Sequence, residues 1–392
     1  MNVRSQKIFM IGIGGMGMAP LAVYLAGEGH DVRDWDDGLT EIVRRILARE
    51  GVRISRDAEF PEDADVLVYS SAIASSHPIL RRACEAGVPT LKRGEMLAQQ
   101  AKGRRLVAIV GSHGKTTTAA MIAHILNGQG FNAGFVGGGL FNDDSLPPAW
   151  NSSGKWLVAE IDESDGSIEH FSPEITLLTN LDWDHPDQYN REEDLQDTFR
   201  RLFARTGRHL LLPFSQAEAL MDLIPEQGNP KVSFFGEQGD FEGEILSGGC
   251  KGGELLLGGQ FHGRRELVRT KGTFNMHNAL AALATCHSMG LKRMGGVLED
   301  FKGIHRRQTV LYDSRKLSVL ADYAHHPTEI SALLDSAREW YPGRRLAVVF
   351  QPHRYSRTAR FREAFARELD KADQLMVLPV YPAGEKECSD GN

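Results

Sequence analysis

The sequence lacks the features of a membrane-bound, a secreted or a zinc-binding protein. No apolar run approaches the about 18 residues that a membrane-spanning helix requires. The apolar segment near the N-terminus is interrupted by Gly12, Gly14, Gly15 and Gly17, so we expect no signal peptide. The four cysteines are scattered without CxxC spacing, which argues against a zinc knuckle and favours a reducing compartment. We therefore predict a cytoplasmic protein without a membrane partner.

An excess of positive charge is also missing. The chain has 45 Lys and Arg residues against 52 Asp and Glu residues, a formal net charge of −7. No global basic field therefore favours nucleic acid as a partner, and an anionic ligand would be bound locally by loops and single arginines. With 392 residues, of which 41% are hydrophobic and 25% charged, the composition predicts a globular protein of two or three domains.

Alternating strand and helix patterns divide the chain into three units, which predicts an α/β protein with parallel sheets. The first unit, 1–103, begins with a buried strand pattern at 7–14. The second, 104–308, contains a Gly-rich alternating segment at 231–271 that predicts a small antiparallel sheet. The third, 309–392, shows three strand patterns, whereas a doubly wound domain usually has five or six. We therefore expect the third unit to be an incomplete doubly wound domain.

The first unit carries a glycine-rich loop, IGIGGMGM, at 11–18. Its Gly-x-Gly-x-x-Gly spacing between a strand and a helix matches the dinucleotide fingerprint, in which the helix N-terminus attracts phosphate. Asp34, Asp36 or Asp37 could meet a ribose hydroxyl of NAD, but equally one of a uridine nucleotide. The fingerprint alone leaves these alternatives open.

The second unit opens with another phosphate-binding pattern, IVGSHGKTTT, at 109–118. It resembles a P-loop, in which backbone N–H groups surround phosphates, Lys115 reaches the terminal ones and Thr116 meets Mg²⁺. Only two residues separate its two glycines, so the loop is shorter than the general pattern. Two such loops in one chain predict two phosphorylated ligands, one of which is ATP with Mg²⁺.

Seven segments, the first of which belongs to the second loop, point to one family. GSHGKTTT, EIDESDGS, NLDWDHPDQY, HNALAAL, HRR, DYAHHPTE and FQPHRYSRT occur in this order. In this respect the sequence resembles the Mur ligase family from residue 7 to the last residue, and its motifs are most similar to those of the member that adds L-alanine. The resemblance implies a Rossmann-like UDP-substrate domain at 1–103, a central P-loop ATPase domain at 104–308 and a Rossmann-like amino-acid-binding domain at 309–392.

The resemblance also implies a reaction of peptidoglycan precursor synthesis. In that reaction ATP phosphorylates the carboxylate of UDP-N-acetylmuramate, and L-alanine attacks the acyl phosphate to form an amide, with release of ADP and phosphate. The first loop would then bind a nucleotide sugar. Divalent cations and Lys115 would offset the repulsion between the two anions. The alternatives are a recycling ligase that adds a tripeptide to the same substrate and, more distantly, a nicotinamide-dependent dehydrogenase. We expect a monomer or a dimer.

Residues that match the family motifs form the predicted site. The catalytic residues are Lys115, Glu160 and His185, and the metal ligands are Thr116, Glu160 and His185. The predicted ATP-binding residues are Gly111, Ser112, His113, Gly114, Lys115, Thr116, Thr117, Asn278 and Arg306. The predicted UDP-substrate-binding residues are Gly12, Gly14, Gly15, Met16, Gly17, Asp36 and Ser71.

The amino acid is expected at the third unit. The predicted amino-acid-binding residues are Tyr323, His325, Arg354 and Arg357. Arginine pairs bidentately with a carboxylate, so Arg354 and Arg357 are expected to hold that of L-alanine. His325 or His326 is expected to accept the proton of the attacking amine, because only a neutral amine is nucleophilic.

Overall fold

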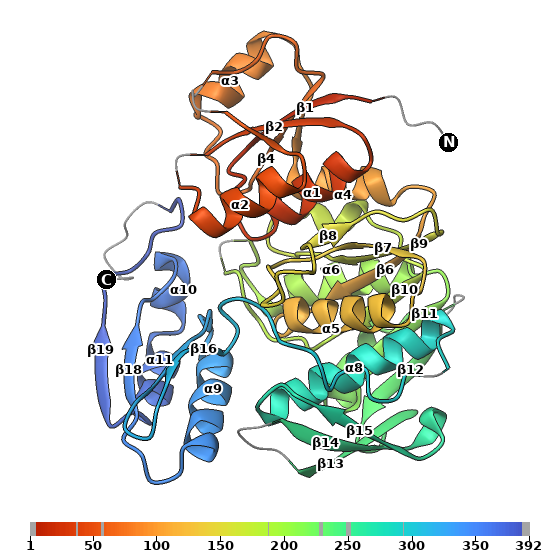
Figure 1. Cartoon of the computed structure of the whole chain (residues 1–392), viewed down its shortest axis with the longest axis vertical. Coiled ribbons are helices and arrows are strands. Elements are labelled where there is room, and N and C mark those ends of the chain that lie inside the picture. Colours follow the sequence, from red (N-terminus) through yellow and green to blue (C-terminus); the bar gives the residue numbers. More distant parts are fainter. Residues whose placement is uncertain are drawn as a thin grey trace.

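The computed structural model describes residues 5–36, 38–55, 59–186, 188–226, 230–247, 252–292 and 294–385. They form three α/β units, of which the first lies at one end of the molecule and the third lies beside the second (Figure 1). The predicted α/β fold class is confirmed. Among the described residues, no helix combines the length and the apolar character that crossing a bilayer requires.

The N-terminal unit has a parallel five-stranded sheet in the order β3-β2-β1-β4-β5. β1 is the central strand, since Ile8 pairs with Val32 on one side and with Val66 on the other. Its apolar side chains are buried because they pack alternately into the cores on the two faces of the sheet. The strands are β1 (Lys7–Ile11), β2 (Asp31–Trp35), β3 (Arg53–Ile54), β4 (Val66–Tyr69) and β5 (Thr90–Lys92). The helices are α1 (Met18–Gly27), α2 (Glu41–Arg49), α3 (Pro78–Glu85) and α4 (Arg93–Ala101).

The central unit has a ten-stranded sheet in the order β15-β14-β13-β12-β11-β10-β6-β9-β7-β8. Its middle is parallel and buried on both faces, which explains the continuous apolar run of β6. The strands are β6 (Arg105–Val110), β7 (Ala133–Val136), β8 (Ala149–Trp150), β9 (Trp156–Glu160), β10 (Ile175–Leu178), β11 (His209–Pro213), β12 (Lys231–Gly236), β13 (Phe241–Ser247), β14 (Gly253–Leu257) and β15 (Arg264–Val268).

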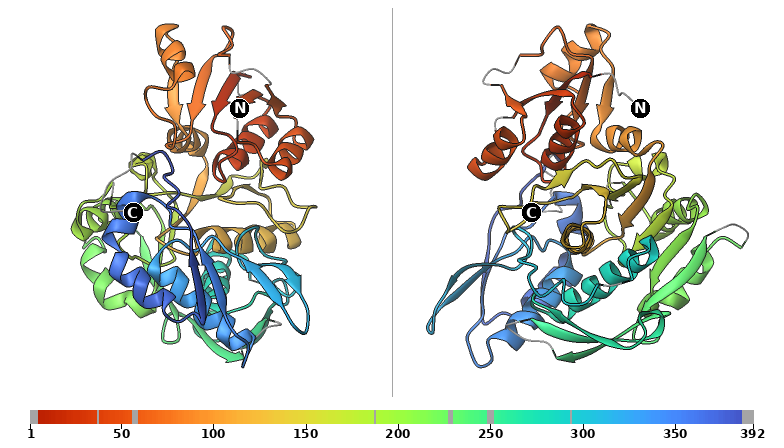
Figure 2. Two further views of the ribbon diagram at one scale, coloured as in Figure 1. Left: turned by 90° about the vertical axis from the view of Figure 1, so that its left-hand side faces the viewer. Right: turned by 45° about the vertical axis from the view of Figure 1, so that its right-hand side comes forward.

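Helices cover both faces of this sheet. α5 (Lys115–Gly128) and α8 (Thr273–Met289) pack side by side on the face that includes Val107 and Ile109 (Figures 1 and 2). α6 (Glu192–Ala204) and α1 belong to the core of the other face, with Ala108 and Val110. The core therefore continues from the central unit into the N-terminal unit. A single turn, α7 (Ala217–Leu220), follows β11.

The segment at 231–271 differs in part from its prediction. β13, β14 and β15 are antiparallel, as expected. However, β13 also pairs in parallel with β12, with Phe235 opposite Phe241, and so extends the main sheet. The small sheet is therefore a continuation of the central sheet, because this pairing leaves no edge between them.

The C-terminal unit has two two-stranded sheets within its described residues. β16 pairs antiparallel with β17, and β18 pairs in parallel with β19, so the predicted strand patterns do not pair into one doubly wound sheet. Its small core contains Ile330, Leu334, Phe350, Phe365 and Leu369. The strands are β16 (Thr309–Asp313), β17 (Ser318–Ala321), β18 (Ala347–Phe350) and β19 (Gln374–Val377), and the helices are α9 (Pro327–Trp340), α10 (Tyr355–Arg360) and α11 (Arg362–Leu369).

Candidate active site

The first glycine-rich loop connects β1 to α1 and is braced by a carboxylate. Gly12 has a φ of +76°, and a Cβ there would lie 3.0 Å from that of Ser70, so the turn requires glycine. The Gly14 N–H donates to Oδ2 of Asp36 over 2.6 Å, and the Gly38 N–H donates to Oδ1 over 2.7 Å. The predicted substrate residue Asp36 therefore holds the shape of the loop in this structure.

The other residues predicted for the first ligand differ in accessibility. Asp34 is fully buried, so it does not reach a ribose in this structure. Asp37 lies outside the described residues. Gly15 and Ser71 are exposed and Met16 is partly buried, so these three remain accessible to a ligand.

The second loop is compressed between two segments of the central unit. Gly111 has a φ of +124°, and a Cβ there would lie 2.5 Å from the carbonyl oxygen of Asn180. Gly114 has a φ of +77°, and its Cβ would lie 2.5 Å from Oδ1 of Asn278. The His113 N–H donates to Oδ1 of Asn180 over 2.9 Å. Close backbone approach thus explains both glycines and brings Asn278 against the loop.

Lys115 begins α5 and points back into the loop. Its ammonium donates to the two carboxylate oxygens of Glu163 over 2.9 and 3.0 Å, and to the carbonyl of Gly111. Burial opposes the charged form of Lys115, but Glu163 and the neighbouring acids outweigh it and raise the lysine pKa. Lys115 is therefore a buried cation, and Glu163 occupies the position at which a phosphate group would pair with it.

Acidic side chains beside the loop form two groups. In one, the hydroxyl of Thr116 donates to Oε1 of Glu160 over 3.2 Å, and Oε2 of Glu160 is buried without a hydrogen-bond partner among the described residues. In the other, Asp162, Glu163 and His185 place their ligand atoms within 4.8 Å of one another. Carboxylate and hydroxyl oxygens suit Mg²⁺, so both groups fit a divalent cation. The predicted metal ligands are thus divided between the two groups.

Lys115 and a second cation, Arg93, which sequence reasoning missed, act on these acids. Burial raises the pKa of Glu160, against the attraction of Lys115. Burial would also raise the pKa of the partly buried Asp162, but Lys115 and other cations, Arg93 among them, hold it below the usual range. The Arg93 guanidinium lies 3.5 Å from the carbonyl oxygen of Gly17, the last glycine of the first loop. Arg93 thus carries positive charge between the two loops.

A cavity of about 1110 Å³ lies between the second loop, α8 and the start of α9. Its wall includes four residues predicted to bind ATP, namely His113, Gly114, Thr117 and Asn278. The linker to the C-terminal unit contributes Arg307 to the wall, whereas the predicted Arg306 has a φ of +58° and is exposed. Arg307, and not Arg306, therefore lines this cavity in the structure.

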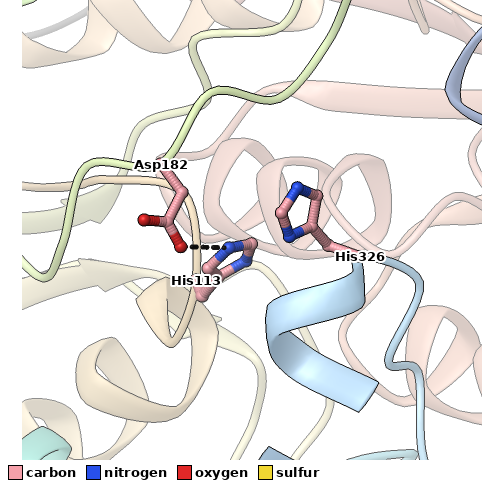
Figure 3. Close-up of side chains that lie close together, drawn as sticks. All are labelled: His113, Asp182 and His326. Carbon is pink, nitrogen blue, oxygen red and sulfur yellow. Dashed lines mark ion pairs between the residues drawn. The ribbon is translucent and has the colours of Figure 1, made fainter. Parts of the chain in front are cut away.

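Figure 3 shows His113, Asp182 and His326 close together, and the first two of them line this cavity. Nε2 of His113 lies 3.0 Å from Oδ2 of Asp182, and the two imidazole rings are 4.8 Å apart. Burial opposes protonation of His113, but the nearby carboxylates of Asp182 and Glu329 raise its pKa to about 9. Burial lowers the pKa of His326 to about 4, and its Nδ1 accepts from the Thr328 N–H. His113 is therefore charged and His326 neutral near pH 7.

The segments after β17 and β18 bring the predicted amino-acid-binding residues together. The ring of His325 is 5.1 Å from that of Tyr323 and 5.9 Å from that of His353. Arg354 follows directly, with a φ of +72°, and its guanidinium lies 3.6 Å from a carboxylate oxygen of Glu385. His353 and Glu385 were not predicted, although His353 belongs to the motif that identified its neighbours.

Arg357 differs from its prediction. Its side chain is 2% exposed and donates to both carboxylate oxygens of Asp184, over 2.8 and 3.0 Å. Asp184 belongs to the central unit and is itself 3% exposed. The guanidinium therefore joins the C-terminal unit to the central unit in this structure, and it does not present an open cation to an amino acid.

Three models of the same family match successive parts of the chain. The Mur ligase family catalytic domain matches residues 7–105, the Mur ligase middle domain matches residues 109–286, and the Mur ligase glutamate ligase domain matches residues 305–389. Together they include both glycine-rich loops, the acidic groups and the amino-acid segments.

Curated proteins and solved structures agree with these matches. UDP-N-acetylmuramate–L-alanine ligases of Desulfatibacillum aliphaticivorans and Desulforapulum autotrophicum are 36% and 35% identical to the chain; each match covers 98% of it and 85% or 86% of the relative. The UDP-N-acetylmuramate–alanine ligase structure of Thermotoga maritima has a TM-score of 0.79 at 29% identity, covering 97% of this chain and 86% of that one. A murein peptide ligase of Psychrobacter arcticus shares the fold, with a TM-score of 0.75 at 22% identity, over 96% and 91% of the two chains.

Proposed function

The chain belongs to the Mur ligase family, and from this premise we propose that it joins L-alanine to UDP-N-acetylmuramate in an ATP-dependent reaction. The observation that carries the proposal is Lys115 of the second loop, which pairs with Glu163 beside two groups of carboxylates. His113 and Gly114 of the same loop line a cavity whose wall also includes Glu329 of the C-terminal unit. The relatives that cover nearly the whole chain have the same named activity.

In the first step, the carboxylate of UDP-N-acetylmuramate attacks the γ-phosphate of ATP. Both reactants are anions, so positive charge must stand where they meet. Lys115 exchanges Glu163 for a phosphate group, and Arg93 adds a second cation beside the first loop. The bond between the β- and γ-phosphates breaks, so the products are ADP and an acyl phosphate, which is a more reactive electrophile than the carboxylate.

Mg²⁺ fits the acidic groups on the chemistry of their side chains. Thr116 with Glu160, and Asp162 with Glu163 and His185, are the residues that would hold it. When bound, Mg²⁺ would neutralise negative charge on the phosphates. The unpartnered Oε2 of Glu160 supports this role, because a buried carboxylate oxygen without a partner is costly.

In the second step, the amine of L-alanine attacks the acyl phosphate and expels phosphate. Arg354 holds the carboxylate of the amino acid, and Arg357 positions this segment through Asp184. Burial lowers the pKa of His325, so its imidazole is neutral and can accept the proton that the amine loses.

The test is phosphate release from ATP by the full chain with UDP-N-acetylmuramate and one amino acid at a time. We expect turnover with L-alanine that requires Mg²⁺. Turnover with the tripeptide but not with L-alanine would favour the recycling activity. Binding of NAD without binding of UDP-N-acetylmuramate, measured by calorimetry, would refute the proposal. A cytoplasmic location follows from the need for ATP and stays part of the proposal.

A further inference from the structure

Glu329 connects three segments that are far apart in the sequence. It lies in the first turn of α9, and its side chain is 13% exposed in the wall of the cavity between the second loop and the C-terminal unit. Its neighbours come from the second loop, from the linker that precedes β16 and from the amino-acid segment after β17.

The two carboxylate oxygens of Glu329 face different partners. Oε1 lies 3.4 Å from Nδ1 of His113 and 3.8 Å from the guanidinium of Arg307. Oε2 accepts from the backbone N–H of His325 over 2.9 Å and lies 3.3 Å from Nδ1 of the same residue. One carboxylate therefore joins the nucleotide side of the cavity to the residue that is expected to face the amine.

The contacts of His325 determine which ring nitrogen is available. Nδ1 lies 2.7 Å from the carbonyl oxygen of Tyr323, and because a carbonyl only accepts, this nitrogen must carry the hydrogen. The second oxygen that faces this N–H is Oε2 of Glu329. In the neutral ring, Nε2 then presents a lone pair. A base whose other nitrogen is oriented by a carboxylate is an arrangement suited to proton transfer.

A simpler reading is that Glu329 only caps α9. Acidic side chains in the first turn of a helix commonly accept a backbone N–H near the helix start. That role explains the bond from the His325 N–H, but it requires neither His113 nor Arg307. Burial alone would raise the pKa of Glu329, but His325, His113 and Arg307 hold it well below the usual range. The carboxylate is therefore charged and engaged on both sides.

We propose that Glu329 is a positioning residue that couples the nucleotide loop to the proton-accepting face of His325. His113 and Arg307, on the nucleotide side of the cavity, hold one oxygen of the Glu329 carboxylate. The other oxygen then fixes the ring and the backbone of His325 for the incoming amine. This inference rests on the proposed function, because it assigns Glu329 to the second step of that reaction.

The kinetic test uses Glu329→Gln, which keeps the size of the side chain and removes its charge. We expect the ADP formed in the first turnover without L-alanine to change less than about threefold, and kcat/KM for L-alanine to fall about 10²-fold. The matched control is Asp335→Asn on the same helix, an exposed residue that pairs with Lys371 and should leave both quantities unchanged. The proposal would be overturned if Glu329→Gln lowered ADP formation as much as kcat/KM for L-alanine. It would also be overturned if Asp335→Asn lowered kcat/KM for L-alanine as much as Glu329→Gln does.

A double-variant cycle tests the coupling itself. His113→Gln should also lower kcat/KM for L-alanine, although His113 belongs to the nucleotide loop. If His113 acts through Glu329, the double variant loses no more than the more impaired single variant. Losses that multiply would show that the two residues act independently, and the coupling would be refuted.

Amide hydrogen exchange provides a readout that does not depend on turnover. Glu329→Gln should accelerate exchange in 321–326 and in 111–114, while the later turns of α9 exchange as in the wild type. If exchange accelerated only in the first turn of α9, Glu329 would act only as a helix cap, and the proposal would be overturned. If the wild-type chain proved to use another amino acid, the proposed function would fail, but this exchange result would still decide the role of Glu329.

Discussion

Replacing Arg357 by methionine removes the cation of a buried ion pair between the central and C-terminal units. The nearer of its two contacts with Asp184 measures 2.8 Å. At this distance two unit charges attract by about 6 kcal/mol in a medium with an effective dielectric constant of about 20. The loss of hydration of both charges offsets much of this attraction. The variant leaves the carboxylate of Asp184 buried without its bidentate partner. Breaking one half of such a pair typically costs about 3–5 kcal/mol, and we expect a loss of that order.

Calorimetric unfolding of the full chain measures this loss. Because the pair joins two units, we expect the C-terminal unit to unfold at a lower temperature and to separate from the transition of the rest. Arg362→Met is the matched control, since Arg362 is exposed in the neighbouring helix α11. If Arg357→Met unfolded at the same temperature as this control, the reasoning from the buried ion pair would be wrong.

The pH dependence provides a second check on the same pair. Burial alone would raise the pKa of Asp184, but His185 and Arg357 hold it well below the usual range of an aspartate carboxyl group. A carboxyl group whose pKa is lower in the folded than in the unfolded state stabilises the fold at any pH above the unfolded pKa. This contribution is lost as the pH falls towards the folded pKa. The advantage of the wild type over Arg357→Met should therefore shrink below about pH 4. An advantage that stayed constant between pH 7 and pH 3 would contradict the assignment.

Three further predictions concern other sites. Lys115→Ala should leave the fold intact and lower ATP turnover by about 10²-fold or more, measured as phosphate release, because it removes the cation nearest the transferred phosphate. Glu160→Gln should raise the Mg²⁺ concentration needed for half-maximal turnover, and an unchanged Mg²⁺ titration would exclude Glu160 as a ligand. Burial raises the pKa of Asp34 to about 6, so the folded state holds this proton more tightly than the unfolded state and loses stability as the pH rises from about 4 to 7. Chemical denaturation should show Asp34→Asn gaining about 2–3 kcal/mol relative to the wild type over that interval, and a constant difference would refute it.

Arg306 and Arg307 show why a motif alone did not place a side chain. Both follow the second unit in the HRR segment, and sequence reasoning favoured the first. Arg306 has a positive φ, which reverses the chain locally, and the next residue lines the cavity. Backbone conformation at a linker depends on the units that it joins, so neighbouring residues of the same type cannot be distinguished beforehand.

The sequence by itself determined the two glycine-rich loops, because each consists of consecutive residues between a strand and a helix. It also determined the α/β class, since alternating apolar patterns reflect how strands and helices bury their faces. Only the tertiary structure decided that Arg357 meets Asp184, 173 positions away, and that Glu329 meets His113. Such contacts form where separate units pack together, and the same side chains carry no local pattern that reveals their partners. The sequence therefore predicts which groups are available, whereas the packing of the units decides which groups meet.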